Sequence, residues 1–109
     1  MLAKIERGGD RFGATVDTGW WGTQGYDAAR AIEELGPHVL HVHLKDVLAV
    51  DEPHETCRWG QGIVPVEECV RALRRSGYTG VIAVEHEPET FDPSDDLRAM
   101  RGQLEEWLR

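Results

Sequence analysis

Short apolar runs alternate with stretches of helical periodicity along the whole chain, and this alternation limits the fold more than any other feature. Residues 12–17, 39–45 and 81–85 have the length and apolar content of strands. Between and after them, residues 26–35 and 65–75 carry apolar side chains on one helical face, and a last helix starts near Asp92, its expected N-cap. Strands and helices that alternate at roughly 30 residues predict right-handed βαβ units and a parallel sheet.

The length of the chain bounds how much of such a fold is present. Its 109 residues are expected to form a single domain, residues 1–109. Three strands cannot close a barrel, because a complete (β/α)8 barrel needs about 250 residues. The sequence therefore predicts either part of a larger barrel or a small open α/β sheet.

Composition excludes several classes of function. The net charge of -8 and the pI near 5.0 disfavour nucleic acid as a partner, because affinity for phosphates comes mainly from Lys and Arg. No run approaches the ~20 apolar residues of a membrane span. We therefore expect no membrane partner. Cys57 and Cys69 form no C-x-x-C pair, so we expect two reduced thiols in a cytoplasmic protein.

Side chains that suit metal ions end each of the three strands. Alternation is expected to place Phe12, Ala14, Val16, Leu40, Val42, Leu44, Ile82 and Val84 under the helices. The opposite face then ends in Asp17, His43 and Glu85, and the carboxyl ends of parallel strands lie at one edge of the sheet. Two carboxylates and an imidazole suit Mn2+, Mg2+, Co2+ or Zn2+. Each residue alone also fits a helix cap or a histidine bonded to a carbonyl.

Four motifs in this order resemble the xylose isomerase-like TIM barrels, a family that includes sugar phosphate isomerases and epimerases, ketose 3-epimerases, inosose dehydratases and endonuclease IV. The motifs are Val16-Asp17-Thr18-Gly19 with Gly25-Tyr26-Asp27, then His41-Val42-His43-Leu44-Lys45-Asp46, then Gly60-Gln61-Gly62, and finally Gly77-Tyr78-Thr79-Gly80 followed by Glu85. The resemblance covers nearly the whole chain and implies the C-terminal three β/α units of a (β/α)8 barrel.

The resemblance also implies roles. Asp17, His43 and Glu85 match three of the family's four metal ligands, and Glu85 matches one of the two glutamates that move protons at a substrate carbon. The fourth ligand, a Glu on an earlier strand, has no counterpart in these residues. The activity implied is therefore that of a metal-dependent sugar (phosphate) isomerase or epimerase acting next to a carbonyl, as part of a complete barrel.

One departure from the family pattern concerns Trp20, which stands where the family often has the His of an Asp-x-x-His motif. Because that His binds the substrate or a second metal in the family, its replacement implies a single metal ion and a different side chain in the wall of the pocket. Trp20 either stacks on a sugar ring or anchors a loop. Endonuclease chemistry is disfavoured, because at least two ligands of its zinc cluster are absent and the chain is acidic.

Further residues are expected to bind substrate, each with an alternative. His41 and Lys45 share the face of His43, and Lys45 either pairs with Asp46 or points outward. Arg58 suits a carboxylate, a phosphate or a vicinal diol, or else a surface salt bridge. Glu87 shares the face of Glu85 and is expected beside the metal site or as the ligand itself. His86 falls on the helix side, and no catalytic role is expected for it.

Two other functions remain open from the sequence. The first is an inosose-type dehydratase of the same family, because removal of the same proton can end in loss of a hydroxyl. The second is a non-catalytic truncated half-barrel, whose open sheet edges favour a missing N-terminal barrel half or a second copy as partner.

Overall fold

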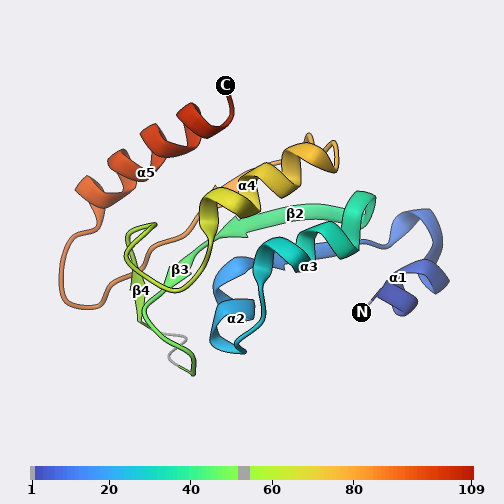
Figure 1. The fold of residues 1–109 in the computed structure, drawn as a ribbon, viewed down its shortest axis with the longest axis horizontal. Helices are drawn as coiled ribbons and strands as arrows, with labels where there is room; N and C mark the ends of the chain where they lie inside the picture. The colour runs from blue at the N-terminus through green and yellow to red at the C-terminus, as the bar shows by residue number, and fades with distance from the viewer. Residues whose placement is uncertain (1, 52–54) are drawn as a thin grey trace.

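The computed structural model describes residues 2–51 and 55–109. The elements, in chain order, are α1 (Leu2–Gly8), β1 (Ala14–Asp17), α2 (Thr18–Thr23), α3 (Ala28–Leu35), β2 (Val39–Leu44), β3 (Asp46–Val47), β4 (Thr56–Cys57), α4 (Val66–Arg75), β5 (Ile82–Val84) and α5 (Ser94–Trp107), with 3-10 turns at Gly9–Arg11 and Gly36–His38 (Figure 1). Every predicted strand and helix is present, which confirms the alternation of the sequence.

The main sheet is three-stranded and parallel in the order β1-β2-β5, so β2 is its central strand. Asp17 pairs with His43 across β1 and β2, and Leu44 pairs with Val84 across β2 and β5. The carboxyl ends of all three strands therefore lie at one edge, as expected of successive βαβ units. The fold class predicted from the sequence is confirmed.

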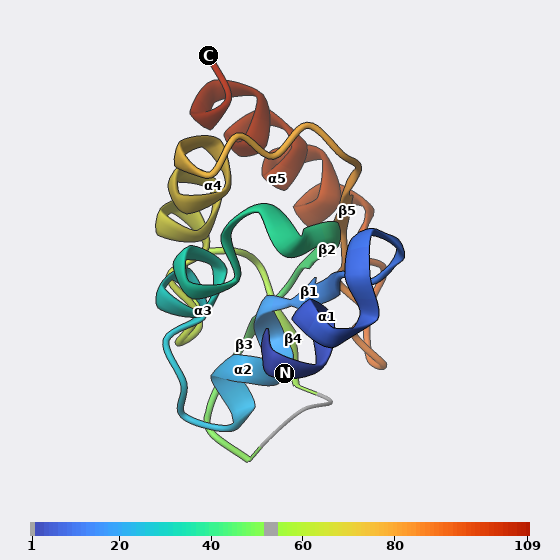
Figure 2. The ribbon, with the colours of Figure 1, turned by 90° about the vertical axis from the view of Figure 1, so that its right-hand side faces the viewer.

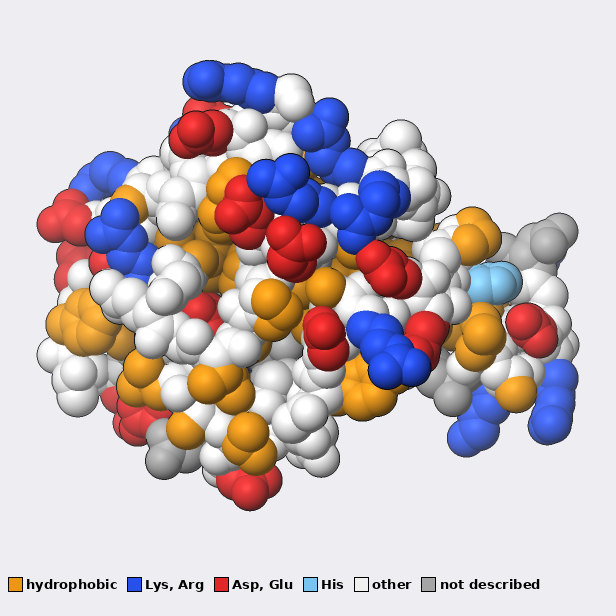
Figure 3. All heavy atoms as spheres, viewed as in Figure 1, with side chains coloured by type: hydrophobic (Ala, Val, Ile, Leu, Met, Phe, Trp, Pro, Cys, Tyr) orange, Lys and Arg blue, Asp and Glu red, His pale blue; other side chains and the backbone are white. Residues whose placement is uncertain are grey.

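Helices α3, α4 and α5 lie side by side on one face of this sheet (Figure 2). Val16, Val42 and Leu44 point into that interface and are fully buried, together with Ile32 of α3 and Leu73 of α4. The outward side of the helices carries interspersed acidic and basic side chains, as Figure 3 shows, some of them paired one turn apart, such as Glu67 with Arg71. Burial of a continuous apolar layer is the main stabilisation of the sheet.

The expected alternation is wrong at Phe12 and Leu40, which are 63% and 58% exposed. The β1–β2 ladder shifts register between Ala14 and Thr15, so that Ala14 pairs with Val39 but Thr15 pairs with His41. Leu40 is the extra residue of this bulge; Val39 takes the buried position and Leu40 turns outward over Gly13, where a Cβ would collide with it. Phe12 precedes β1 and follows a 3-10 turn, so strand alternation does not apply to it.

Two features of the fold were not predicted from the sequence. Residues 18–23 form the short helix α2, capped by the Asp17 carboxylate, which accepts the backbone N–H of Trp20. The segment after β2 contains the antiparallel hairpin of β3 and β4. Both lie at the carboxyl ends of the strands, so they form walls of the candidate site.

Helix α5 begins at Ser94, two residues later than the expected N-cap Asp92. The Asp92 carboxylate nevertheless accepts the backbone N–H and the hydroxyl of Ser94, which fixes the start of the helix. Within residues 2–51 and 55–109, no helix has both the length and the apolar character needed to cross a membrane.

Candidate functional site at the carboxyl ends of the sheet

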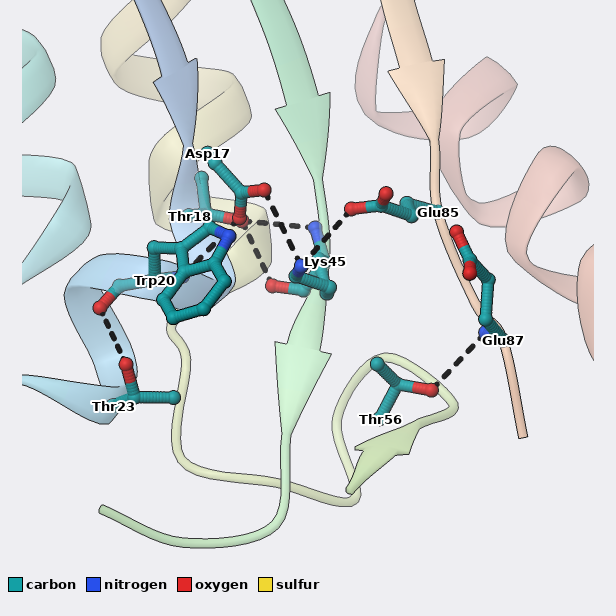
Figure 4. Close-up of polar contacts among 8 residues, drawn as sticks. All are labelled: Asp17, Thr18, Trp20, Thr23, Lys45, Thr56, Glu85 and Glu87. Carbon is teal, nitrogen blue, oxygen red and sulfur yellow. Dashed lines mark hydrogen bonds and ion pairs between the residues drawn. The ribbon is translucent and has the colours of Figure 1, made fainter. Parts of the chain in front are cut away.

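Lys45, which directly follows β2, lies at the centre of the candidate site. Its Nζ is 3.3 Å from Oδ2 of Asp17, at the end of β1, and 3.1 Å from Oε2 of Glu85, after β5 (Figure 4). The Lys45 side chain is only 10% exposed, and the two carboxylates are 21% and 25% exposed. Side chains at the ends of three different strands thus meet at one point, as the strand pattern predicts for Asp17 and Glu85.

Helix α2 holds Lys45 in this position. The hydroxyl of Thr18 donates to the carbonyl oxygen of Lys45 at 2.8 Å and accepts its backbone N–H at 2.9 Å. Gly19 lies against the lysine stem, and a Cβ there would come within 2.6 Å of Cε. The indole of Trp20 covers the ammonium at 5.4 Å from the ring centroid. The segment 16–20 therefore holds the Lys45 side chain in place.

The charge of Lys45 is fixed by its surroundings. Burial alone would lower its pKa, but the Glu85 carboxylate and the Asp17 carboxylate outweigh that effect and raise the pKa above its usual value of 10.5. Lys45 therefore remains an ammonium ion at neutral pH. Chemistry that needs a free lysine amine, such as Schiff-base formation, is disfavoured at this site.

His41 and His43 lie on the open face of β2, opposite the helices. Both are half-buried, and their rings meet edge to face with centroids 4.9 Å apart. His43 is the register partner of Asp17, so the backbones of the two residues lie side by side.

The predicted metal ligands fit a cation only in part. Asp17 and Glu85 converge on a single positive charge, that of Lys45. Among the described residues, however, no three His, Cys, Asp or Glu side chains are close enough together to hold a metal ion. The structure thus brings two of the three predicted ligands together, and metal binding stays a prediction.

Asp46 has a structural role, and neither alternative for Lys45 holds, since its ammonium pairs with other carboxylates and its side chain is buried rather than pointing outward. The Asp46 carboxylate is fully buried and accepts four backbone N–H groups, those of Val47, Gly60, Gly62 and Val64, at 2.9–3.1 Å. The Gly-x-Gly motif is explained by this contact, because a Cβ on Gly62 would overlap Val47 O and Asp46 Oδ1. Asp46 therefore shapes the loop that carries Arg58.

The remaining predicted residues line the edges of the site. Trp20 is 50% exposed, so it is not a buried anchor, whereas Trp21 packs against the core. Arg58 is half-buried and, with Thr56, Gln61 and Phe91, lines a hollow of about 280 Å³ between the hairpin and the loop after β5. Glu87 is exposed, and its backbone N–H donates to Thr56 Oγ1 at 3.1 Å.

Sequence reasoning missed Thr18, and it placed Lys45 on the correct face without seeing that it is the centre. A signal was available: the period of two puts Lys45 on the face of His41 and His43, directly beside the ends of the neighbouring strands. The role of Thr18 had no such signal, because it depends on the turn into α2.

A parallel β/α sheet with carboxylates converging at the carboxyl ends of its strands is the arrangement found in (β/α)8 enzymes, which build their sites at that end. The family model of the xylose isomerase-like TIM barrel matches residues 1–109, so the chain belongs to that family. The resemblance seen in the sequence motifs is confirmed.

Solved structures agree with the family. A D-tagatose 3-epimerase-like protein superposes with a TM-score of 0.70 and 26% identity, over 88% of this chain and 34% of that one. A xylose isomerase domain protein from Alicyclobacillus acidocaldarius subsp. acidocaldarius superposes with a TM-score of 0.72 and 26% identity, over 98% of this chain and 42% of that one. No curated protein matches the chain. The chain thus spans less than half the length of these structural relatives.

Proposed function

We propose that these residues supply the C-terminal part of the active site of a metal-dependent sugar or sugar phosphate isomerase or epimerase. The observation that carries the proposal is the convergence of the Asp17 and Glu85 carboxylates, from opposite sides of β2, on one positive charge. The family and its epimerase-like and isomerase-like relatives support the reaction class.

Glu85 is the proposed proton carrier. It would take a proton from the carbon next to the substrate carbonyl, and a proton would be returned at that carbon or its neighbour. In the family a second glutamate on an earlier strand shares this task. The Glu85 carboxylate is three-quarters buried, which would limit the exchange of a transferred proton with bulk water.

The proposed metal would be held by Asp17, His43 and Glu85 together with a ligand outside these residues. When bound, Mn2+, Mg2+, Co2+ or Zn2+ would polarise the carbonyl and hydroxyl oxygens of the sugar.

Substrate contacts are proposed for Trp20, His41, Lys45, Arg58 and Glu87, which border the same edge of the sheet. The exposed indole of Trp20 offers a surface for a sugar ring, and the Arg58 guanidinium suits a phosphate or a vicinal diol.

Activity is proposed for the complete barrel, since the described sheet has three strands and the relatives are longer. The partner of this chain is therefore the N-terminal part of a barrel, in the same or another chain, or a second copy of this one.

The test uses the complete barrel, with Mn2+, keto sugars and inososes in D2O. Deuterium entering at carbon without an elimination product supports isomerisation or epimerisation, whereas release of a dehydrated product assigns the dehydratase. Glu85→Gln should reduce turnover by at least about a hundredfold, whereas Glu106→Gln on the exposed side of α5 should not. Full activity of Glu85→Gln would contradict the proposal.

A further inference from the structure

His86 lies between Glu85 and Glu87 in sequence but faces away from both, and its side chain is fully buried. Its Nδ1 is 3.1 Å from Oγ1 of Thr56 in β4, and its Nε2 is 3.0 Å from Oδ2 of Asp96 in α5. The Phe91 ring packs edge-on against it, with centroids 5.9 Å apart. One imidazole thus joins the hairpin, the end of β5 and helix α5.

The polar groups around His86 form one continuous chain of hydrogen bonds. In the neutral ring, the Asp96 carboxylate accepts a proton from Nε2, and Nδ1 then accepts the hydroxyl proton of Thr56. Thr56 Oγ1 in turn accepts the backbone N–H of Glu87 at 3.1 Å. With this tautomer each donor meets an acceptor, from the backbone of residue 87 to helix α5.

The line of hydroxyl, imidazole and carboxylate has the composition of a nucleophilic triad, but its surroundings argue against that chemistry. The His86 ring is 0% exposed, and Thr56 Oγ1 already donates to His86 and accepts from Glu87. A nucleophilic hydroxyl needs a lone pair directed at the substrate and a base that reaches the leaving group, whereas the Glu87 N–H occupies a lone pair of Oγ1 and the His86 ring is enclosed. The arrangement fits a structural tie between three segments.

These hydrogen bonds hold the segment directly after the end of β5. β5 stops at Val84, and the last bond to β2 is from the Glu85 N–H to Leu44 O at 3.0 Å. Residues 86 and 87 are then held by Asp96 and Thr56 in place of a neighbouring strand. Because successive side chains in an extended chain point to opposite sides, fixing His86 on the helix side fixes Glu85 on the side of Lys45.

From these contacts we infer that the Thr56–His86–Asp96 relay is a positioning device, which sets the Glu85 carboxylate against Lys45 and ties it to the hairpin that precedes Arg58. The inference rests on the proposed function only for the importance of Glu85 to the reaction. Reacting groups need to be held within about 0.5 Å, and a 1 Å misplacement costs on the order of a hundredfold in rate.

The test compares Thr56→Val, which removes the hydroxyl at nearly constant volume, with Thr56→Ser, which keeps it. Thr79→Val is the matched control, since Thr79 is exposed in the turn before β5. In each background of the 109-residue chain, the coupling between Lys45 and Glu85 is measured by a double-mutant cycle of Lys45→Met and Glu85→Gln in urea. Amide exchange of Glu87 is followed in parallel.

We expect a coupling of about fivefold in the unfolding constant in the parent, in Thr56→Ser and in Thr79→Val, and its loss in Thr56→Val. The Glu87 amide should exchange about tenfold faster in Thr56→Val alone. Should Thr56→Val unfold, Asp96→Ala repeats the test from the partly exposed end of the relay.

Retention of the full coupling in Thr56→Val, with a Glu87 amide that exchanges faster, would overturn the inference. The outcome is independent of the proposed function. A complete barrel in which Glu85→Gln stays active removes that function and leaves the coupling result in place.

Discussion

Replacement of Lys45 by Met tests the centre of the site most directly. Met keeps most of the stem that packs against Gly19 and Trp20, but it removes the ammonium that lies 3.3 Å from Asp17 and 3.1 Å from Glu85. The Asp17 carboxylate would still cap α2 through the N–H of Trp20. The change in the free energy of unfolding therefore measures mainly the loss of the Lys45 ammonium charge.

The expected cost follows from the burial of the three groups. Removing one partner of a fully buried ion pair costs about 3–5 kcal/mol, whereas exposed pairs are worth at most about 1 kcal/mol. With carboxylates 21% and 25% exposed, solvent screens part of their charge, so we expect a loss of about 2–3 kcal/mol at pH 7.

The assay is urea denaturation followed by far-UV circular dichroism. Lys4→Met is the control, because Lys4 is the only other lysine in the chain and lies exposed on α1. It should change the stability by no more than about 0.5 kcal/mol.

The pH dependence adds a second check. Since the pKa of Lys45 is raised in the folded state, its stabilisation is present below the usual value of 10.5 and is lost as the pH rises through the folded pKa. Equal stability of Lys45→Met and Lys4→Met at pH 7 would refute the reasoning.

Three further predictions concern other contacts. Asp46→Ala should lose about 3–5 kcal/mol in urea denaturation, because four N–H groups at its buried carboxylate lose their acceptor; a loss below about 1 kcal/mol would show that the loop does not depend on it. Burial raises the pKa of the Cys57 and Cys69 thiols to about 12, and Asp46 adds to the shift at Cys57, so neither thiol should react with Ellman's reagent at pH 8 until urea is added; stability should fall as the pH rises above 9.0, since the unfolded thiols ionise first. Gly19→Ala should destabilise by about 1–3 kcal/mol by displacing the Lys45 stem, whereas Gly102→Ala in α5, where a Cβ meets no atom within 4 Å, should stabilise by about 0.5–1 kcal/mol; the same sign for both in thermal melts would contradict this explanation.

The order of strands and helices could be predicted because burial imposes a period on the sequence. Val16, Val42 and Leu44 follow the period of two and are buried as expected. Leu40 breaks it because a bulge is set by how two strands pair, which a single run of residues does not reveal.

Helix α2 could not be predicted, since its six residues are Gly, Trp and Thr, which have low helix propensity. It forms because Asp17 caps it and Thr18 bonds to the backbone of Lys45. Tertiary contacts of this kind override local preference.

The site was predicted as far as strand ends determine it. Asp17 and Glu85 converge as expected, but the sequence pattern contains no information on the torsions that bring the Lys45 ammonium between them. Likewise, the partners of His86 come from segments 30 residues before it and 10 residues after it, so no local pattern could identify them.

The order β1-β2-β5 has a mechanical consequence for this site. Lys45 follows the strand with neighbours on both sides, whereas each carboxylate is carried by a strand with one neighbour in this sheet. The separation between Asp17 and Glu85 therefore depends on how strongly the sheet is curved about β2. Strands added beyond β1 and β5 would impose the curvature of a closed barrel. The distances from the Lys45 ammonium to the two carboxylates would then change with the closure of the barrel.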